Sequence, residues 1–578
     1  MINQDRELEM EKIPFGYWHT EAADVCEGDL YQFLLDGEIL RADPASLSQP
    51  QGVHGPSQVV SRTSFHWSDD RWKGLPLKDM IIYELHVGTF ADNASFTGVA
   101  DRLDYLVDLG INTIELMPIS QFPGGRNWGY DGVYPFATQN TYGGSEGLKK
   151  LVDACHSKGI AVVLDVVYNH MGPEGNYLND FGPYFTDKYS TPWGKAINFD
   201  DAYSDPVRSF FMQNALMWLD EYHIDGLRLD AIHAIKDLGA NHFLKELSGK
   251  VRSLEEQKGR NIPLIGECDL NDTKFIKPAT DGGYGLDGQW IDEFHHAIHA
   301  LLTKENTGYY EDFGTFEHLF KAFSDTYVYD GTYSSHRHKV FGNSALDRPY
   351  SQFVVFSQNH DQVGNRMMGD RLTSLLTYDQ LKLCAVAVLL SPYVPMLFMG
   401  EEYAETKDFQ YFVSHTDKGL VEAVRQGRKS EFAYFQKEGL ETPDPQSEQT
   451  FKNSTLSWNM QEEKRATMLK LYQKLIKLRK ELPALQSSER NLTVFNKNDN
   501  YIIAMKRISR DGGKAHIIMN FGNQKASYQL PQDDENVFKC LLDTSQDSWL
   551  GKNNNERTAM KGEDQLDIAA YSAVILSN

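Results

Sequence analysis

The chain contains 578 residues, of which 41% are hydrophobic and 12% aromatic, a composition that supports large cores and excludes a disordered chain. Its length predicts roughly two to four domains. The 81 acidic residues outnumber the 57 lysines and arginines, and the resulting formal charge of −24 repels nucleic acid and anionic membranes. A neutral sugar would be indifferent to this charge.

The compartment is indicated by what the sequence lacks. The first seven residues contain no basic segment followed by an apolar stretch, so we expect no signal peptide. The apolar run Ala385–Leu390 is far too short to span a bilayer. Five cysteines are scattered along the chain without CxxC pairing, as is typical of reduced thiols. These features predict a cytoplasmic protein.

Residues 1–75 carry short alternating patterns broken by Gly and Pro turns, and they predict a few β-strands. From Met80 the pattern changes to apolar strand, turn and amphipathic helix. This alternation predicts an α/β fold, a (β/α)8 TIM barrel over residues 76–485. The predicted strands are Ile81–Val87, Ile111–Pro118, Ala161–Val167, Gly226–Asp230, Pro263–Glu267, Gln289–Phe294, Phe353–His360 and Pro395–Met399, with helices such as Val99–Leu109, Ser145–Lys158 and Pro206–Tyr222 between them.

The last part of the chain departs from this rhythm twice. The polar, aromatic stretch near residues 401–459 is too long for an ordinary loop and predicts a helical insertion. The basic amphipathic stretch Leu469–Lys480 could suit a membrane surface, but its leucine stripe suits the final barrel helix, which we favour. Alternation then returns and predicts a C-terminal β-sandwich over residues 486–578.

Three carboxylates close or follow predicted barrel strands: Asp230, Glu267 and Asp361. A side chain at the carboxyl end of a barrel strand points into the mouth where TIM-barrel enzymes react. Three such carboxylates on separate strands are hard to explain by packing alone. A nucleophile, a general acid and an orienting carboxylate are what retaining glycoside hydrolysis needs.

Neighbouring polar residues have both structural and functional interpretations. Asp165 is expected to hydrogen-bond inside the barrel, whereas His170, past the end of the third strand, is expected to contact substrate. Arg228 lies two residues before Asp230, so both side chains point to one face, and the arginine would keep the carboxylate ionised. Trp128–Asp131 offers aromatic faces for a sugar, although loop aromatics can merely pack.

Two further patterns do not pass their context tests. Gly283–Gly288 matches GxGxxG but precedes a strand, which excludes the dinucleotide-binding interpretation. His295 and His299 are spaced for one helix face, but no HExxH or cysteine partner accompanies them, so a helix near the site edge is favoured over zinc.

The strand-end motifs together resemble the α-amylase superfamily, glycoside hydrolase family 13. Asp165–His170, Gly226–Asp230, Glu267 and His360–Asp361 correspond to its four short signatures, in order. The resemblance implies that Asp230 is the nucleophile, Glu267 the acid/base, and Asp361 the carboxylate that holds the sugar hydroxyls. It also implies a subsite for the cleaved glucose, lined by Arg228, His170, His360 and Tyr130.

A closer resemblance is to the malto-oligosyltrehalose trehalohydrolase family, which cleaves the α-1,4 bond next to a terminal trehalose unit. The family implies a malto-oligosyltrehalose or α-glucan substrate and a functional link to a malto-oligosyltrehalose synthase. Asp131, His233, Asp269, Asp292 and His296 are expected to bind substrate, and the loops after the fifth and sixth strands, Asp269–Asp272 and Asp292–His296, are expected to form the trehalose end. The motifs are Tyr83–Phe90, Gln121–Asp131, Gly172–Tyr177, Leu229–His233, Gly266–Asp272, Trp290–His296 and Gln358–Asn365.

One departure concerns the N-terminus, where Gly16–Trp18 already resembles the middle of the family's first β-sandwich, so a shortened sandwich is expected over residues 1–75. No organic cofactor and no metal-ligand set are expected. Calcium stays open, since calcium-binding members of the superfamily use an asparagine equivalent to Asn169. Two alternatives remain: a glycogen branching enzyme or other α-amylase-type glucanase, and a glucan-binding protein without catalysis.

Overall fold

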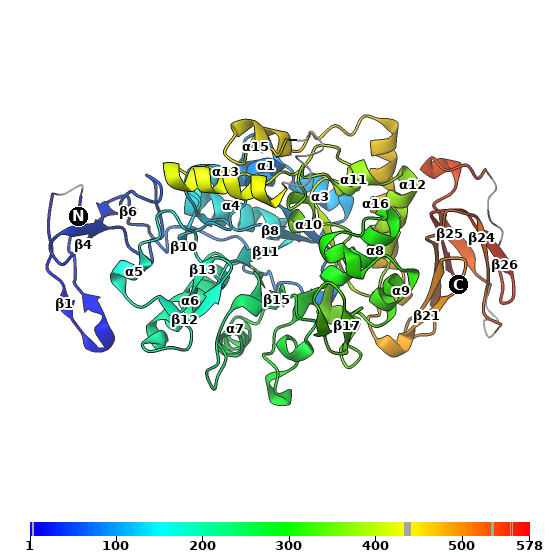
Figure 1. Cartoon of the computed structure of the whole chain (residues 1–578), viewed down its shortest axis with the longest axis horizontal. Coiled ribbons are helices and arrows are strands. Elements are labelled where there is room, and N and C mark those ends of the chain that lie inside the picture. Colours follow the sequence, from blue (N-terminus) through cyan, green and yellow to red (C-terminus); the bar gives the residue numbers. More distant parts are fainter. Residues whose placement is uncertain (3–4, 433–440, 533–536, 555–556, 558) are drawn as a thin grey trace.

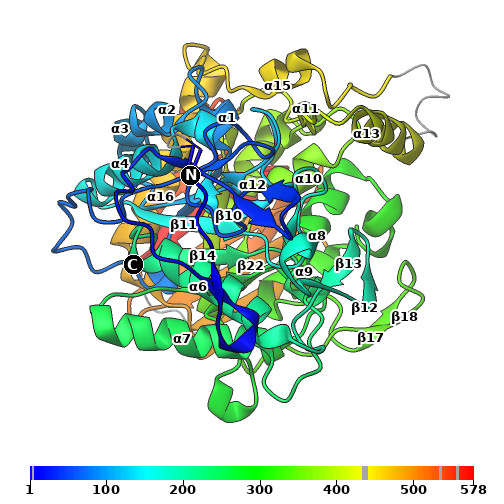
Figure 2. The same cartoon turned by 90° about the vertical axis from the view of Figure 1, so that its left-hand side faces the viewer.

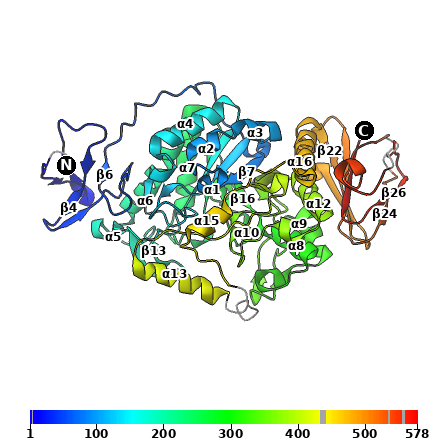
Figure 3. The same cartoon turned by 90° about the horizontal axis from the view of Figure 1, so that it is seen from above.

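A computed structural model describes the chain except for residues 3–4, 433–440, 533–536, 555–556 and 558. Small N-terminal strands and a C-terminal sheet lie at opposite ends of the molecule, with the barrel between them (Figure 1; Figure 3 shows the same order from above).

Eight parallel strands close into a barrel whose order around the ring follows the chain, which confirms the predicted (β/α)8 fold. Their Val, Ile and Leu side chains are buried on both faces, as strands covered by helices outside and by side chains inside require. The strands are β7 (Ile82–Leu85), β8 (Thr113–Leu116), β11 (Ala161–Val166), β14 (Gly226–Leu229), β15 (Leu264–Gly266), β16 (Gly288–Trp290), β19 (Phe353–Val355) and β20 (Val394–Phe398).

Seven of the eight strands are shorter than the sequence predicted, and after two of them polar residues start a helix in place of the predicted strand end. The prediction Gln289–Phe294 was wrong after Trp290, since Asp292 opens α8 (Asp292–Thr303). The prediction Phe353–His360 was wrong after Val355, since the Asn359 side chain caps α10 (His360–Gly364) by accepting from the Gln362 N–H at 2.8 Å. Asp292, His296 and Asp361 therefore lie on helices.

Helices cover the barrel, and the predicted helix Val99–Leu109 is divided in two. Between β15 and β16 the chain forms only 3-10 turns, η5 (Thr273–Phe275) and η6 (Ala279–Asp281), in a stretch rich in Gly and Pro. The main helices are α2 (Phe96–Ala100), α3 (Leu103–Leu109), α4 (Gly144–Ser157), α6 (Ser204–Asp220), α7 (Phe243–Lys258), α9 (Phe316–Ser324), α12 (Tyr378–Leu389) and α16 (Glu463–Glu481).

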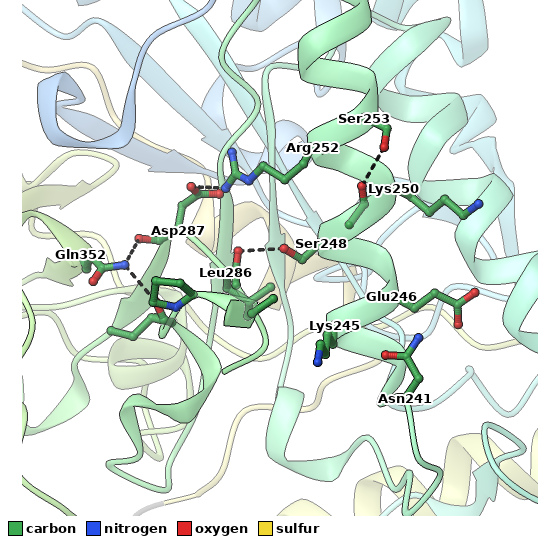
Figure 4. A pocket seen from close by; sticks show the side chains of 15 residues that line it. Asn241, Lys245, Glu246, Ser248, Lys250, Arg252, Ser253, Leu286, Asp287 and Gln352 are labelled. Carbon is green, nitrogen blue, oxygen red and sulfur yellow. Dashed lines mark hydrogen bonds and ion pairs between the residues drawn. The ribbon is translucent and has the colours of Figure 1, made fainter. Parts of the chain in front are cut away.

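A cavity of about 740 Å³ is lined by α7 and by the segment that leads from η5 to β16. It opens between α7 and the segment before β16, with Ser248 and Arg252 on one side and Asp287 and Gln352 on the other (Figure 4). The predicted site residues do not line it.

The stretch near residues 401–459 contains helices among the residues that the structure describes. They are η9 (Glu401–Tyr403), α13 (Lys418–Glu431) and α15 (Glu448–Ser454). Figure 2 shows α13 on the same side of the barrel as two hairpins, β12–β13 (Phe185–Thr191, Gly194–Ile197) and β17–β18 (Thr332–Ser334, Lys339–Phe341). Across the described part of the chain, every helix is too short or too polar to cross a bilayer.

The N-terminal strands form three two-stranded antiparallel ladders. Behind them, Asp69 and Trp72 attach the entering chain to the barrel: the Trp72 indole N–H donates to Asp225 at 2.6 Å, and His156 bridges Asp69 and Asp225. The ladders pair β1 (Glu11–Lys12) with β2 (Trp18–His19), β3 (Leu30–Tyr31) with β6 (Ser57–Gln58), and β4 (Phe33–Leu35) with β5 (Ile39–Arg41).

The C-terminal sheet has two buried faces that follow the period of two along its strands. Ile502 and Ala504 pack toward the small β24–β26 ladder, whereas Ile503 and Met505 belong to the core shared with the barrel. The five-stranded sheet has the order β21 (Thr493–Lys497), β22 (Ile502–Ile508), β23 (Lys514–Asn520), β27 (Ser572–Ser577), β25 (Lys539–Asp543), and the ladder pairs β24 (Ala526–Gln529) with β26 (Gln565–Ile568).

Candidate active site

The three carboxylates singled out in the sequence lie at the carboxyl-terminal end of the barrel. Asp230 follows β14 directly, Glu267 follows β15 directly, and Asp361 lies in the first turn of α10, beyond β19. The ends of β14 and β15 fix the positions of Asp230 and Glu267, and the helix cap by Asn359 fixes the position of Asp361.

The guanidinium of Arg228 contacts both Asp230 and Glu267. Its Nη1 donates to Asp230 Oδ1 at 2.8 Å and to Asp165 Oδ2 at 2.7 Å, and its Nη2 pairs with Glu267 Oε2 at 3.0 Å. The arginine is 1% exposed, and its guanidinium lies 4.2 Å from the centre of the Trp290 ring. A planar, permanently charged donor stacked on an indole is held in one orientation.

Asp230 is placed to remain ionised. Burial alone would raise its pKa, but the Arg228 charge, the nearby His170 and a 2.6 Å hydrogen bond from Asn169 Nδ2 lower the pKa below its ordinary value. An ionised, partly desolvated carboxylate is the form that a nucleophile requires.

Glu267 is placed to remain protonated. Burial raises its pKa well above the ordinary range, and the negative charges of Asp230, Asp361 and Asp292 add to this effect against the opposing charge of Arg228. Its Oε2 also accepts the Ala231 N–H at 2.8 Å. Ala231 presents that N–H from a left-handed conformation, with φ of +39°, which costs backbone energy and is typical of functional sites.

His360, which is buried, and Tyr130, which is partly buried, form a second group beside Asp165. The Tyr130 hydroxyl donates to Asp165 Oδ2 at 2.7 Å and lies 2.8 Å from His360 Nε2. On its other side, His360 Nδ1 lies 2.5 Å from Glu84 Oε1. Burial raises the pKa of Asp165 to about 6 despite Arg228, and Asp165 bonds inside the barrel, away from a reacting role.

His170 lies in the loop after β11, where its Nε2 is 3.1 Å from the Tyr130 carbonyl oxygen. The ring of Trp193, from the turn between β12 and β13, stacks on His170 at 4.6 Å between centroids. Trp193 is 49% exposed, so part of its indole face stays open to solvent. An exposed aromatic face at a barrel mouth suits contact with a sugar ring.

Asp361 and Asp292 provide the more open acidic side of the mouth. The Asp361 side chain is 43% exposed and accepts from Asn365 Nδ2 at 3.0 Å. Burial and the charges of Asp361 and Asp269 raise the pKa of Asp292 to about 7. The Gln362 amide donates to Asp292 Oδ1 at 3.4 Å.

Three other predicted substrate residues lie around this side. Asp269 forms a two-bond ion pair with Arg337 of the β17–β18 hairpin, and its backbone N–H donates to His233 Nδ1 at 3.5 Å. Burial lowers the pKa of His233, which therefore offers a neutral imidazole. His296 packs against the rings of Tyr309 and Phe313, an aromatic group that joins α8 to the segment after it.

Asp131 connects the mouth to the insertion. It accepts from Asn127 Nδ2 at 2.6 Å and lies 3.7 Å from His415 Nε2. His415 Nδ1 lies 3.2 Å from Glu174, which also accepts the Thr416 N–H at 2.9 Å. The segment around His415 is thus held on the barrel next to the loop that carries Asp131.

Comparison with known proteins decides the family. The alpha-amylase catalytic domain family matches residues 62–192 and 200–488. A malto-oligosyltrehalose trehalohydrolase of Saccharolobus solfataricus is 47% identical over 86% of this chain and 85% of its own length, and one of Mycobacterium tuberculosis is 39% identical over 98% and 95%. A crystal structure from Salmonella typhimurium, provisionally described as an alpha amylase, aligns with a TM-score of 0.88 at 35% identity over 99% of this chain and 94% of that one.

The chain belongs to the malto-oligosyltrehalose trehalohydrolase family. This family lies within the wider alpha-amylase family, whose catalytic domain covers the barrel. The family resemblance that the strand-end motifs suggested is therefore confirmed.

Sequence reasoning missed several residues that shape this trehalohydrolase-family site. Glu84 could have been found from the sequence, because it is a charged residue inside the apolar strand Ile82–Leu85. Trp193 and Arg337 lie in hairpin turns outside the family motifs, and only the fold brings them to the mouth.

Calcium does not fit the residues around Asn169. Its Nδ2 donates to the carbonyl oxygen and Oδ2 of Asp230, and its Oδ1 contacts His170 Nδ1. A calcium site needs several oxygens directed at the ion, whereas both polar atoms of this side chain face protein groups. Within the described residues, no three His, Cys, Asp or Glu side chains are grouped to hold a metal.

Proposed function

We propose that the chain is a retaining glycoside hydrolase that cleaves malto-oligosyltrehalose at the α-1,4 bond next to the trehalose unit. Trehalose and a shortened maltodextrin are the products. The chemistry rests on one observation: Asp230 and Glu267 share the Arg228 guanidinium, yet the pKa of the first is lowered and that of the second is raised. Family membership supports the substrate.

In the first step, Asp230 attacks the anomeric carbon of the maltodextrin glucose bonded to trehalose. Protonated Glu267 gives its proton to the departing O4 of the trehalose unit, and a covalent glycosyl-enzyme forms. Once it has lost that proton, Glu267 is a base. It then takes a proton from water as the water attacks the same carbon, and Asp230 leaves with the original configuration restored.

The surrounding residues hold the glucose whose bond is cleaved. Asp361 would accept hydrogen bonds from its hydroxyls and favour ring distortion, while Arg228 keeps Asp230 ionised. Tyr130, His360 and His170 would line the same subsite, and Asp131 would lie at its edge beside the insertion. The open face of Trp193 supports a stacking contact with the chain.

The trehalose unit would occupy the side beyond Glu267. Asp292 and the Asp269–Arg337 pair place polar groups there, with His233 between Asp269 and the end of β14. His296 would act on this end of the site through the aromatic group that it forms with Tyr309 and Phe313. A site that hydrogen-bonds substrate hydroxyls discriminates against analogues with the wrong pattern far better than an apolar site does.

The proposal includes a cytoplasmic location and a functional link to a malto-oligosyltrehalose synthase. All five cysteines are free thiols, which supports a reducing compartment. The substrate carries a trehalose unit at the end of a maltodextrin, so another enzyme must first convert that end, and the synthase has this activity.

Two alternatives make different predictions. A branching enzyme would transfer the glycosyl group to a 6-hydroxyl of a second chain instead of to water. A glucan-binding protein would bind without turnover, which the opposed pKa shifts of Asp230 and Glu267 argue against.

The test compares kcat/KM for trehalose-capped and plain maltodextrin of equal length, with Glu267→Gln as the inactive control. We expect a strong preference for the capped chain, with free trehalose as the small product. Equal rates on both substrates would indicate a general glucanase, new α-1,6 branches would indicate a branching enzyme, and no turnover would indicate a binding protein.

A further inference from the structure

Glu84, on the first barrel strand, holds His360 through two hydrogen bonds. Its Oε2 accepts the His360 backbone N–H at 2.9 Å, and its Oε1 lies 2.5 Å from the ring Nδ1. Both residues are 1% exposed. The carboxylate thus fixes the backbone at the start of α10 and the orientation of the imidazole together.

The hydrogen-bond pattern is complete in one protonation state of His360. An imidazolium donates from Nδ1 to Glu84 and from Nε2 to the Tyr130 oxygen, which leaves the Tyr130 proton for Asp165. A neutral ring protonated on Nδ1 would make Nε2 and Asp165 compete for that single proton. A neutral ring protonated on Nε2 would direct the Nδ1 lone pair at the Glu84 carboxylate.

We propose that Glu84 is a positioning residue that holds His360 as an imidazolium, orients the Tyr130 hydroxyl toward Asp165, and so keeps a positive charge beside the cleaved glucose. The use of this charge in hydrolysis rests on the proposed function, whereas the protonation of His360 in the free protein does not. His360 Nε2 lies 3.8 Å from Asp361 Oδ1, so the charge also faces the orienting carboxylate.

The groups around His360 favour its cation. Burial alone disfavours the charged ring, but Glu84, followed by Asp361, raises the pKa of His360 to about 9 against the opposing charge of Arg228. The titratable or charged groups that face it are Glu84 on β7, His86 after β7, Glu115 on β8, Tyr130 before β10, Asp165 on β11, Arg228 on β14 and Asp361 on α10.

Glu115 provides a matched control. It is the register partner of Glu84 on the adjacent strand, is also 1% exposed, and its two carboxyl oxygens have no hydrogen-bond partner among the described residues. Burial and the Glu84 charge raise its pKa well above the ordinary range, so it is a neutral acid. Glu115→Gln exchanges one neutral group for another, whereas Glu84→Gln removes a charge.

The experiment follows the His360 ring by NMR of protein labelled with 15N-histidine, with the signal assigned by its loss in His360→Asn. Wild-type protein and Glu115→Gln are expected to keep both ring N–H protons through neutral pH. In Glu84→Gln the ring should lose its proton roughly 1–3 pH units lower, the effect of one opposite charge at this distance. The alkaline limb of the pH profile of kcat/KM on trehalose-capped maltodextrin should also move to lower pH.

Glu84→Asp keeps the charge, so the pKa of His360 in this variant should lie between its values in Glu84→Gln and in the wild type. Circular dichroism checks that each variant is folded. If Glu84→Gln does not fold, the wild-type titration still decides. A wild-type His360 that is neutral at pH 7, or equal shifts in Glu84→Gln and Glu115→Gln, would overturn the inference. A protonated His360 in a protein that releases no trehalose would refute the proposed function alone.

Discussion

Arg228 contacts three carboxylates, and the pKa of each depends on what else surrounds it. Asp230 has further stabilisation of its charge from Asn169 and His170, so its pKa is lowered. Glu267 faces other negative charges, so its pKa is raised. One buried cation can therefore support both a nucleophile and an acid, because the remaining neighbours differ.

Removal of the proposed nucleophile, Asp230, is the first test at the residue scale. Asp230→Ala should lower kcat by several orders of magnitude with little change in substrate binding, because the lost group acts mainly in the transition state. Steady-state kinetics and binding calorimetry measure the two effects. Added azide should restore part of the turnover by attacking in place of the carboxylate, and near wild-type activity without azide would show that the nucleophile is another group.

Removal of the shared cation should move the pH profile. In Arg228→Met the pKa of Asp230 rises, and since activity needs the ionised form, the acid limb of kcat/KM should move to higher pH. Arg337→Met is the control, because it breaks the pair with Asp269 and should change substrate preference without moving the acid limb. Equal movement in both variants would contradict this role for Arg228.

At the scale of single elements, His156 joins the end of α4 to the chain that enters the barrel. Its Nδ1 lies 2.7 Å from Asp69 Oδ2 and its Nε2 2.9 Å from Asp225 Oδ2. Burial opposes the cation, but the two carboxylates raise the pKa of His156 overall. Burial alone would raise the pKa of Asp69, but the hydrogen bonds and charges of His156 and His223 lower it overall.

These shifts define a pH window for stability. A histidine whose pKa is raised in the folded protein stabilises the fold below its ordinary pKa, and this contribution is lost as the pH rises through the folded pKa. An aspartate whose pKa is lowered in the folded protein stabilises the fold above its ordinary pKa. His156→Gln should therefore destabilise most between about pH 4 and about pH 6.5, and less at higher pH. Urea unfolding at several pH values measures this difference, with the exposed His66→Gln as control; a difference that grows above neutral pH would contradict the sign.

The same scale shows what the sequence could and could not predict. Apolar runs between turn residues located all eight barrel strands, and two carboxylates directly after β14 and β15 followed from them. The end of β19 was missed because the polar residues after it cap a helix, and a helix cap looks the same as a polar strand end until the fold is known. Trp193 reaches His170 through a hairpin whose direction no local pattern specifies.

At the scale of the whole molecule, we propose that the chain divides into domains near residues 75 and 485. Buried cations join the barrel to the C-terminal sheet. Lys382, on α12, donates from Nζ to the Thr544 carbonyl at 2.7 Å and the Trp549 carbonyl at 2.9 Å. Arg507, on β22, donates to the Leu390 and Ser391 carbonyls just after the same helix.

Loss of the Lys382 contacts should weaken this junction. Lys382→Met leaves two carbonyls without their donor, and an unsatisfied buried group costs roughly 1–3 kcal/mol. We expect a lower Tm with kcat little changed, because the junction is remote from the barrel mouth. Thermal unfolding checks the prediction, with the exposed Lys470→Met as control; equal Tm values for the two variants would contradict it.

The most direct measurement is 1H NMR of one reaction on trehalose-capped maltodextrin, followed from the first seconds. It reports the small product and the configuration of the new reducing end before mutarotation. We expect free trehalose together with a maltodextrin whose reducing end is first α, because two displacements at the anomeric carbon, first by Asp230 and then by water, retain its configuration. A first-formed β end, or a small product other than trehalose, would contradict it.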